Sequence, residues 1–201
     1  MITLSIDHLN SKVKENMKEI YPLSRYIYKN KFILPELKNK GGIYSFWWIG
    51  KIEELKEALL SCDNYELKGK RPQGKIKVKF TSEWIDFLDD IGNGKICLYV
   101  GKSTDIRGRI SKHLKLGTDN IWLDSKGEKI NKNNGRKPNT ESQLRIGLER
   151  VFNRSIFDGI IDNIGISWTI LTEYDNAINR FYLENYFIGK FYPLFNIDIE
   201  R

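Results

Sequence analysis

The segment 98–113, "LYVGKSTDIRGRISKH", joins an apolar run to a dense group of side chains that could bind a phosphate. After Gly101 it carries five such side chains, namely Lys102, Ser103, Arg107, Arg109 and His113. If a helix starts near residue 104, Arg109 and His113 share one of its faces, and the N–H groups of its first turn attract anions. Such a string is compatible with a phosphate-binding loop, a DNA-contacting helix or a catalytic centre.

Two further basic segments lie elsewhere in a chain whose net charge is +7. Residues 68–79, "KGKRPQGKIKVK", contain no acid, and residues 126–137, "KGEKINKNNGRK", end in a second basic pair. Either segment alone could be a solvated loop, but together with 102–115 they indicate contacts with the phosphates of a polyanion. The residues expected to make them are Lys68, Lys70, Arg71, Lys75, Lys77, Lys79, Arg136 and Lys137, with Ser103 and Arg107 as lesser contacts.

Several other kinds of site are not supported by the residues present. A P-loop needs a glycine-rich run before its lysine, and a single glycine, Gly101, directly precedes Lys102. Cys62 and Cys97 stand in no paired motif, so neither a disulfide scaffold nor a structural zinc site is indicated. No apolar run approaches the roughly 20 residues that span a bilayer, and the N-terminus lacks the apolar core of a signal peptide. We therefore expect a soluble, cytoplasmic protein without membrane contact.

The elements that must position these side chains follow from hydrophobic spacing and from capping residues. The patterns predict strands over 41–50, 75–80, 94–101 and 164–173. They predict helices over 9–20, 21–30, 51–61, 81–92, 104–116, 139–153 and 175–192, with Ser103 or Thr104 capping the helix that starts at 104. The expected fold is a small α/β (α+β) sheet with helices packed on it. Residues 1–40 would form a helical extension, and 41–201 a domain with an insertion over 51–94.

Two short motifs resemble the name-giving elements of the GIY-YIG endonuclease family. They are Gly42-Ile43-Tyr44 and Tyr99-Val100-Gly101, which in that family lie on neighbouring strands of a three-stranded mixed or antiparallel sheet. Further positions match in order, namely Lys102 after the second glycine, Arg109, His113 four residues later, a helical Glu184 and then Asn196. Each match is weak alone, but the ordered set over residues 42–196 is specific.

The resemblance implies a metal-dependent DNA endonuclease that hydrolyses phosphodiester bonds. In it Glu184 would hold one Mg²⁺ or Mn²⁺, which stabilises the leaving oxygen. Tyr44 is the candidate base for the attacking water, provided that neighbouring cations lower its pKa, and His113 could accept the phenolic proton. Tyr99 would position the water or a phosphate oxygen, and Arg109 would meet the transition-state charge. Asn196 would brace the site.

The 54 residues between Tyr44 and Tyr99 exceed the spacing of compact family members. This long insertion resembles restriction enzymes of the family, which lengthen the core to read double-stranded DNA themselves. We therefore expect a stand-alone, sequence-specific type II restriction enzyme, since no room for an appended DNA-binding domain follows Asn196. Cutting both strands of a palindrome would imply a homodimer, and a DNA methyltransferase encoded nearby would support this interpretation. The alternatives are a low-specificity nicking, repair or mobile-element nuclease and a non-catalytic DNA-binding protein.

Overall fold

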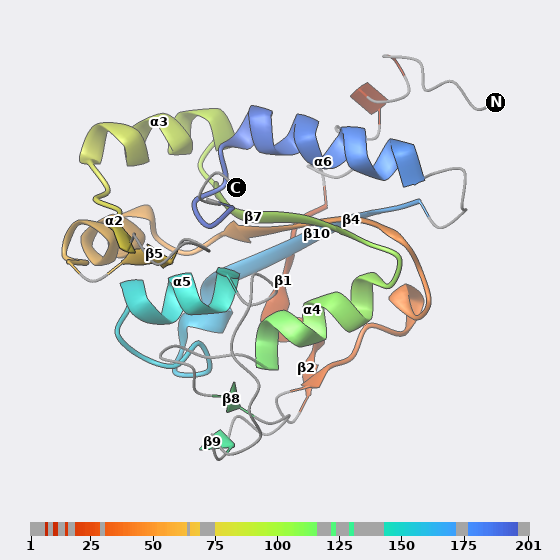
Figure 1. Ribbon diagram of the computed structural model, residues 1–201, viewed down its shortest axis with the longest axis horizontal. Helices are drawn as coiled ribbons and strands as arrows, with labels where there is room; N and C mark the ends of the chain where they lie inside the picture. The colour runs from red at the N-terminus through yellow and green to blue at the C-terminus, as the bar shows by residue number, and fades with distance from the viewer. Residues whose placement is uncertain are drawn as a thin grey trace.

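A four-stranded antiparallel sheet forms the centre of the fold, as the computed structural model in Figure 1 shows. Its strands lie in the order β1 (Tyr21–Pro22), β10 (Ile164–Ile170), β4 (Gly42–Trp48) and β7 (Ile96–Ser103). The structure describes residues 7, 10, 11, 15, 19–28, 31–63, 65–68, 75–115, 122–123, 129–130, 143–171 and 177–196. The predicted α+β class is confirmed. The sheet is entirely antiparallel, and the short β1 adds a fourth strand to the three expected.

β4 is a central strand, and all seven of its residues are buried. Its sequence GIYSFWW contains aromatic and β-branched residues without polar alternation, which is typical of a strand covered on both faces. Successive side chains point to opposite faces. Ile43 and Trp47 therefore belong to one core cluster, whereas Tyr44 and Phe46 belong to the other.

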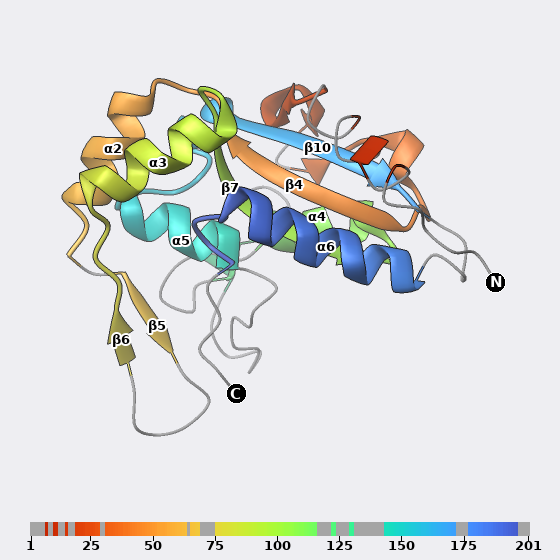
Figure 2. The same cartoon turned by 90° about the horizontal axis from the view of Figure 1, so that it is seen from above.

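Each face of the sheet is covered by two helices. Figures 1 and 2 show α3 (Ser82–Gly92) and α6 (Ala177–Phe191) on one face. α4 (Ile106–Lys115) and α5 (Gln143–Val151) lie on the other face, where Tyr44 points. The predicted helices over 81–92, 104–116, 139–153 and 175–192 therefore correspond to α3, α4, α5 and α6. The last of them ends at Phe191.

The connection between β4 and β7 contains a helix, a hairpin and a second helix. α2 (Ile52–Leu60) follows β4, and β5 (Glu66–Lys68) pairs with β6 (Lys75–Lys77). Figure 2 shows this hairpin projecting away from the sheet. α3 then begins as predicted, because the Thr81 hydroxyl accepts a hydrogen bond from the Trp84 amide at 3.3 Å. α3 ends at Gly92, as predicted, and Asn93 follows it in the left-handed conformation with φ 53°.

The prediction of a helix over 21–30 is wrong. Residues 21–28 instead form β1, a 3₁₀ turn η1 (Leu23–Tyr26) and β2 (Ile27–Tyr28), which pairs with β3 (Lys31–Phe32). Tyr21 pairs with Ile166 of β10, so tertiary pairing overrides the local helical pattern. The 3₁₀ turn η2 (Pro35–Leu37) completes this region.

The predicted helix over 9–20 lies largely outside the described residues. Of residues 117–139, the structure describes the paired strands β8 (Trp122–Leu123) and β9 (Lys129–Ile130). A further 3₁₀ turn, η5 (Ile160–Asn163), leads into β10. Within the described ranges, no helix combines the length and the apolar character that a membrane span requires.

Candidate active site

The turn between β7 and α4 positions the side chains that the sequence singled out. The Asp105 carboxylate accepts a hydrogen bond from the Gly108 amide at 3.0 Å, so Asp105 caps α4. Ser103 and Asp105 exchange two further hydrogen bonds, of 2.9 and 3.0 Å, in the turn before the helix. The predicted capping by Ser103 or Thr104 is therefore wrong. Arg109 and His113 nevertheless lie four residues apart within α4.

Tyr44 and His113 form a buried polar pair beneath the sheet. The Tyr44 hydroxyl lies 2.9 Å from His113 Nε2, and both side chains have no exposed surface. Tyr99 packs against both rings, with ring centroids 6.3 Å from Tyr44 and 4.8 Å from His113. These three predicted site residues therefore form one aromatic cluster.

Gly101 allows Tyr44 to occupy this position. The two residues face each other across the β4–β7 pair, and a Cβ at position 101 would lie 2.5 Å from the Tyr44 hydroxyl oxygen. At Gly42, a Cβ would lie 2.0 Å from the Thr169 carbonyl oxygen of β10. Both glycines of the two motifs thus permit close approaches that no larger residue could make.

Burial raises the pKa of Tyr44 well above its ordinary value. Tyr99 raises this pKa further, whereas Arg109 lowers it as a nearby positive charge and as a hydrogen-bond partner of the hydroxyl. The expectation that cations would lower the Tyr44 pKa is therefore wrong, because desolvation outweighs Arg109. A free phenolate at position 44 is not available at neutral pH.

His113 is held in its neutral form. Burial lowers its pKa to about 3, with the positive charge of Arg109 as a second cause. Arg109 also bonds to the Tyr44 oxygen, and the tautomer of the imidazole sets which of the Tyr44 hydroxyl and His113 Nε2 donates in their hydrogen bond. Within the described part of the chain, Nδ1 has no hydrogen-bond partner. The pair is a phenol hydrogen-bonded to a neutral imidazole.

Glu184 reaches the same end of β7 from α6 on the opposite face. Its Oε1 accepts a hydrogen bond from the Lys102 amide at 3.0 Å, and its Oε2 forms an ion pair with Lys102 Nζ. Negative charge on Glu184 also raises the pKa of Tyr44, so the two groups interact electrostatically across the sheet. The Glu184 carboxylate and the Lys102 ammonium thus form an ion pair at the residue that follows Gly101.

Asn196 binds the free edge of β7. Its side-chain oxygen accepts from the Val100 amide and its side-chain nitrogen donates to the Val100 carbonyl, both at 2.7 Å. The amides of Leu194 and Phe195 donate to the carbonyls of Cys97 and Leu98, at 3.1 and 2.9 Å. Residues 194–196, which follow α6, therefore run beside β7 as far as Val100.

The predicted DNA-binding residues are divided among several places. Ser103 is engaged in the turn before α4, and Arg107 lies half-buried on α4. Lys77 and Lys79 are exposed on β6 and just after it, and the backbones of Lys68 and Lys75 belong to the same hairpin. Lys70, Arg71, Arg136 and Lys137 lie outside the described residues. The hairpin is separate from the Tyr44 cluster.

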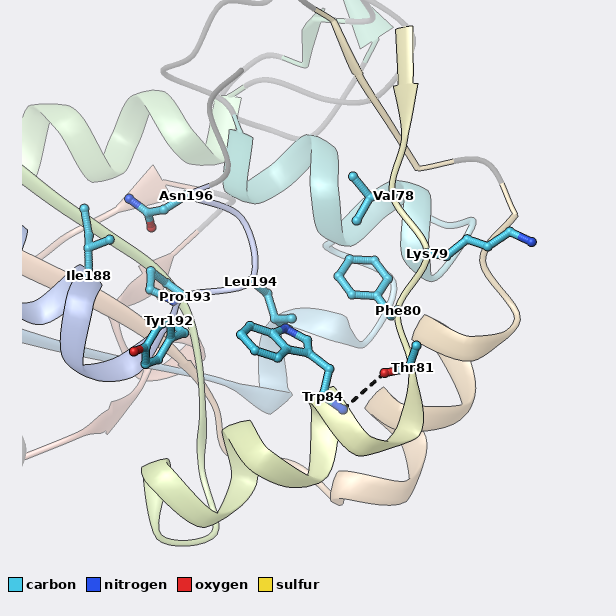
Figure 3. Close-up of a pocket in the computed structure, with 10 residues that line it drawn as sticks. All are labelled: Val78, Lys79, Phe80, Thr81, Trp84, Ile188, Tyr192, Pro193, Leu194 and Asn196. Carbon is cyan, nitrogen blue, oxygen red and sulfur yellow. Dashed lines mark hydrogen bonds between the residues drawn. The ribbon is translucent and has the colours of Figure 1, made fainter. Parts of the chain in front are cut away.

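A cavity of about 510 Å³ lies between the insertion and the segment after α6. Figure 3 shows Trp84, Leu194 and Phe80 facing one another across it, while Lys79 extends away from the other lining side chains. Of the predicted catalytic residues, Asn196 alone lines this cavity. The candidate chemistry therefore lies outside it, at the β7–α4–α6 junction.

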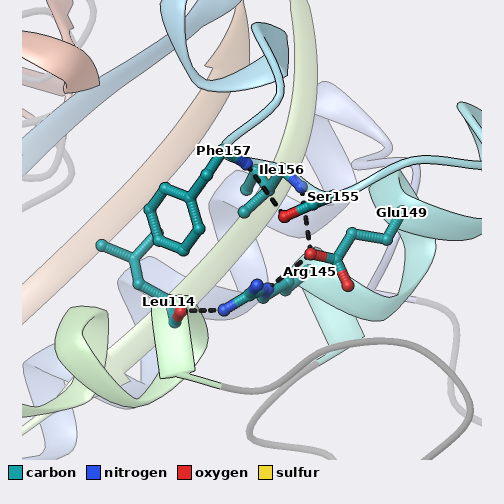
Figure 4. A network of polar contacts seen from close by, with 6 residues as sticks. All are labelled: Leu114, Arg145, Glu149, Ser155, Ile156 and Phe157. Atoms are coloured by element: carbon teal, nitrogen blue, oxygen red, sulfur yellow. Dashed lines mark hydrogen bonds and ion pairs between the residues drawn. The ribbon is translucent and has the colours of Figure 1, made fainter. Parts of the chain in front are cut away.

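A buried ion pair that the sequence analysis missed supports α4. Figure 4 shows Arg145 of α5 bonded to Glu149 at 2.7 Å and to the Leu114 carbonyl at the end of α4. Glu149 also accepts from the Ile156 amide at 3.0 Å, and the Arg145 guanidinium lies 4.9 Å from the centroid of the Phe157 ring. The spacing of four residues between Arg145 and Glu149 was a visible signal for their pairing, but not for their burial.

The described residues contain no group of three His, Cys, Asp or Glu side chains that could hold a metal ion. Among the described side chains, Glu184 has its ion pair with Lys102. No family model matches the chain, and no curated protein or solved structure matches it either. In the described α+β fold, α4 and α6 contact the same end of β7 from opposite faces of the sheet.

Proposed function

We propose that the chain is a metal-dependent DNA endonuclease of the GIY-YIG type, which hydrolyses phosphodiester bonds. The observation that supports this most is the convergence of separated elements on Gly101. Tyr44 of β4 packs against this glycine, and Glu184 of α6 bonds to the next residue. Arg109 and His113 reach Tyr44 from α4. A base, a proton acceptor, a cation for phosphate and a carboxylate are the groups that phosphodiester hydrolysis needs.

The phosphate would be bound by Arg109 and Lys102. Arg109 is half-buried on α4, where a guanidinium interacts with an oxyanion more strongly than in bulk water. Lys102 is exposed and lies next to Glu184, so its ammonium can move to a phosphate oxygen when another cation takes its place. Both residues would stabilise the charge that develops in the transition state.

The proton of the attacking water would pass through Tyr44 to His113. The raised pKa of Tyr44 excludes a resting phenolate, so its hydroxyl must give its proton to Nε2 as it accepts one from the water. Burial lowers the pKa of His113 to about 3 and makes it a weak base in the unliganded fold, so proton transfer to it would depend on a negatively charged phosphate bound beside it. Because Tyr44 has no exposed surface, a water reaches it only when neighbouring side chains shift on substrate binding.

The residues present fit one divalent cation held by Glu184. A single carboxylate suits Mg²⁺ or Mn²⁺, since Mg²⁺ retains waters and takes phosphate oxygens as its other ligands. When bound, the ion would supply charge neutralisation at the leaving oxygen. The Lys102 ammonium now balances the charge of Glu184, so cation binding and release of Lys102 are coupled.

The finer proposal is a sequence-specific type II restriction enzyme that acts on double-stranded DNA as a homodimer. It is supported by the helix–hairpin–helix insertion between β4 and β7, whose Lys77 and neighbouring Lys79 are exposed. Incubation of the protein with unmodified plasmid and phage DNA and Mg²⁺ tests it. Discrete bands are expected, whereas open circles or a smear would favour a low-specificity nuclease. Binding without any cleavage would favour a non-catalytic DNA-binding protein.

A further inference from the structure

The outer face of α6 is apolar although no part of the described fold covers it. Four of its side chains are largely exposed, namely Ile178 (65%), Phe181 (51%), Tyr182 (58%) and Tyr186 (42%). The inner face of the helix, with Leu183, Phe187 and Phe191, already fills the core. Folding therefore does not require the outer aromatic residues, and a contiguous exposed patch of this kind marks a binding surface. These four residues are called the α6 aromatic face below.

This face is continuous with the candidate active site. Phe181 lies one turn before Glu184, and Lys102 Nζ, which pairs with Glu184, lies 5.2 Å from the centroid of the Phe181 ring. Lys190 lies 6.0 Å from the centroid of the Tyr186 ring at the other end of the face. A molecule bound at Glu184 must therefore extend over or beside these aromatic rings.

The charge around the face favours a polyanion. Apart from the four apolar side chains, the exposed residues of α6 are Ala177, Asn185, Gly189 and Lys190, none of which carries a carboxylate. The outer side of α3 on the same layer, by contrast, carries the exposed acids Glu83, Asp86 and Asp90. A second copy docked on this face would add its own Lys102 and Lys190 to a surface that is already flanked by these two cations.

We infer that the α6 aromatic face stacks on unpaired bases of the DNA strand beside the scissile phosphate. Bases offer flat π surfaces to Phe and Tyr only when they are unstacked, and their phosphates satisfy the flanking lysines. A continuous duplex hides these surfaces inside its base stack. DNA with an unpaired stretch next to the cut is therefore the preferred substrate. This inference rests on the proposed nuclease activity, and it favours the low-specificity nuclease alternative over a restriction enzyme that cuts continuous duplexes.

Binding measurements on the full chain, with EDTA in place of divalent metal, test the inference without cleavage. The probes are a fluorescent oligothymidylate of about 20 nucleotides and a blunt duplex of the same length. Tyr182→Ala removes one exposed ring from the face. Tyr28→Ala is the matched control, since Tyr28 is also 58% exposed but belongs to β2. β2 pairs with β3, which packs against α4 on the opposite side of the sheet from α6.

Tyr182→Ala should weaken binding of the single strand at least about fivefold, the loss typical of one stacked base, and leave duplex binding within about twofold. Tyr28→Ala should change neither. Equal losses on both probes, or no loss on the single strand, would overturn the inference. So would a dimer in gel filtration that Tyr182→Ala converts to monomer, because the face would then bind a second copy.

Cleavage is scored separately so that the two proposals can fail independently. If Mg²⁺-dependent cleavage requires Glu184 but Tyr182→Ala binds single strands as tightly as wild type, the inference fails and the nuclease stands. If Tyr182→Ala loses single-strand binding but no preparation cleaves DNA, the aromatic face is a nucleic-acid surface and the nuclease proposal fails.

Discussion

Lowering the pH should destabilise the fold through His113, because this side chain is buried in its neutral form. Its pKa is about 3 in the folded protein, against the usual value of 6.5. Below pH 6.5 His113 therefore takes up a proton in the unfolded chain, whereas in the folded chain it stays neutral down to about pH 3. His113 contacts Tyr44, Tyr99 and Phe46, and Arg109 is the charged group that acts on it. None of these groups compensates an imidazolium.

The magnitude follows from proton linkage. One proton bound by the unfolded chain alone costs about 1.4 kcal/mol of stability for each pH unit. Between pH 6.5 and pH 4.5 the contribution of His113 should therefore fall by about 2 kcal/mol, since the unfolded chain is only half protonated at the upper end of this range. The stability it supplies is complete above pH 6.5 and is lost as the pH falls toward about 3.

Urea denaturation of wild type and of His113→Gln at several pH values isolates this contribution. Gln keeps an acceptor for the Tyr44 hydroxyl but does not titrate, so carboxylate effects cancel in the difference between the two proteins. The slope of that difference should reach about 1.4 kcal/mol per pH unit below about pH 5.5. A difference that stays flat down to pH 4.5 would refute the assignment of His113 as a buried neutral base.

Two substitutions test the packing around the site. Gly101→Ala should lower the free energy of unfolding by about 1–3 kcal/mol, since its Cβ would collide with Tyr44. Gly189→Ala is the control, because its Cβ meets nothing within 4 Å, and it should be neutral or stabilising by up to about 1 kcal/mol. Equal effects of the two substitutions in thermal unfolding would contradict the close contact at Gly101. Arg145→Met should cost about 3–5 kcal/mol by leaving Glu149 charged and unpaired, and Arg145→Met with Glu149→Leu should recover most of that loss. A double variant no more stable than the single one would show that Arg145 acts through other contacts.

The elements around the site could be predicted because their patterns are local. β4 and β7 are apolar runs bounded by turns, and α3 begins at a Thr81 that caps it. Where a pattern was ambiguous, tertiary contacts decided the outcome. Residues 21–28 pair as strands because Tyr21 meets β10, and α4 starts late because Asp105 takes the capping position.

Which residues gather at the candidate site could be predicted better than the pKa values of those residues. The spacing of Arg109 and His113 indicated a shared helix face, and Lys102 with Glu184 could be singled out by motif. The pKa of Tyr44 could not, because it depends on complete desolvation, which the packing of four elements creates. Arg145 was missed for a related reason, since an arginine is rarely fully buried, and its burial depends on Glu149 of the same helix and on the Leu114 carbonyl of α4.

The rate of Mg²⁺-dependent plasmid cleavage by Glu184→Gln tests the central claim most directly. Glu57→Gln on α2 is the matched control, since it makes the same change at an exposed helical glutamate. Loss of the Glu184 carboxylate that we propose holds the ion should reduce the rate about a hundredfold or more, while Glu57→Gln should cleave as wild type does. Cleavage by Glu184→Gln at the wild-type rate would contradict the account.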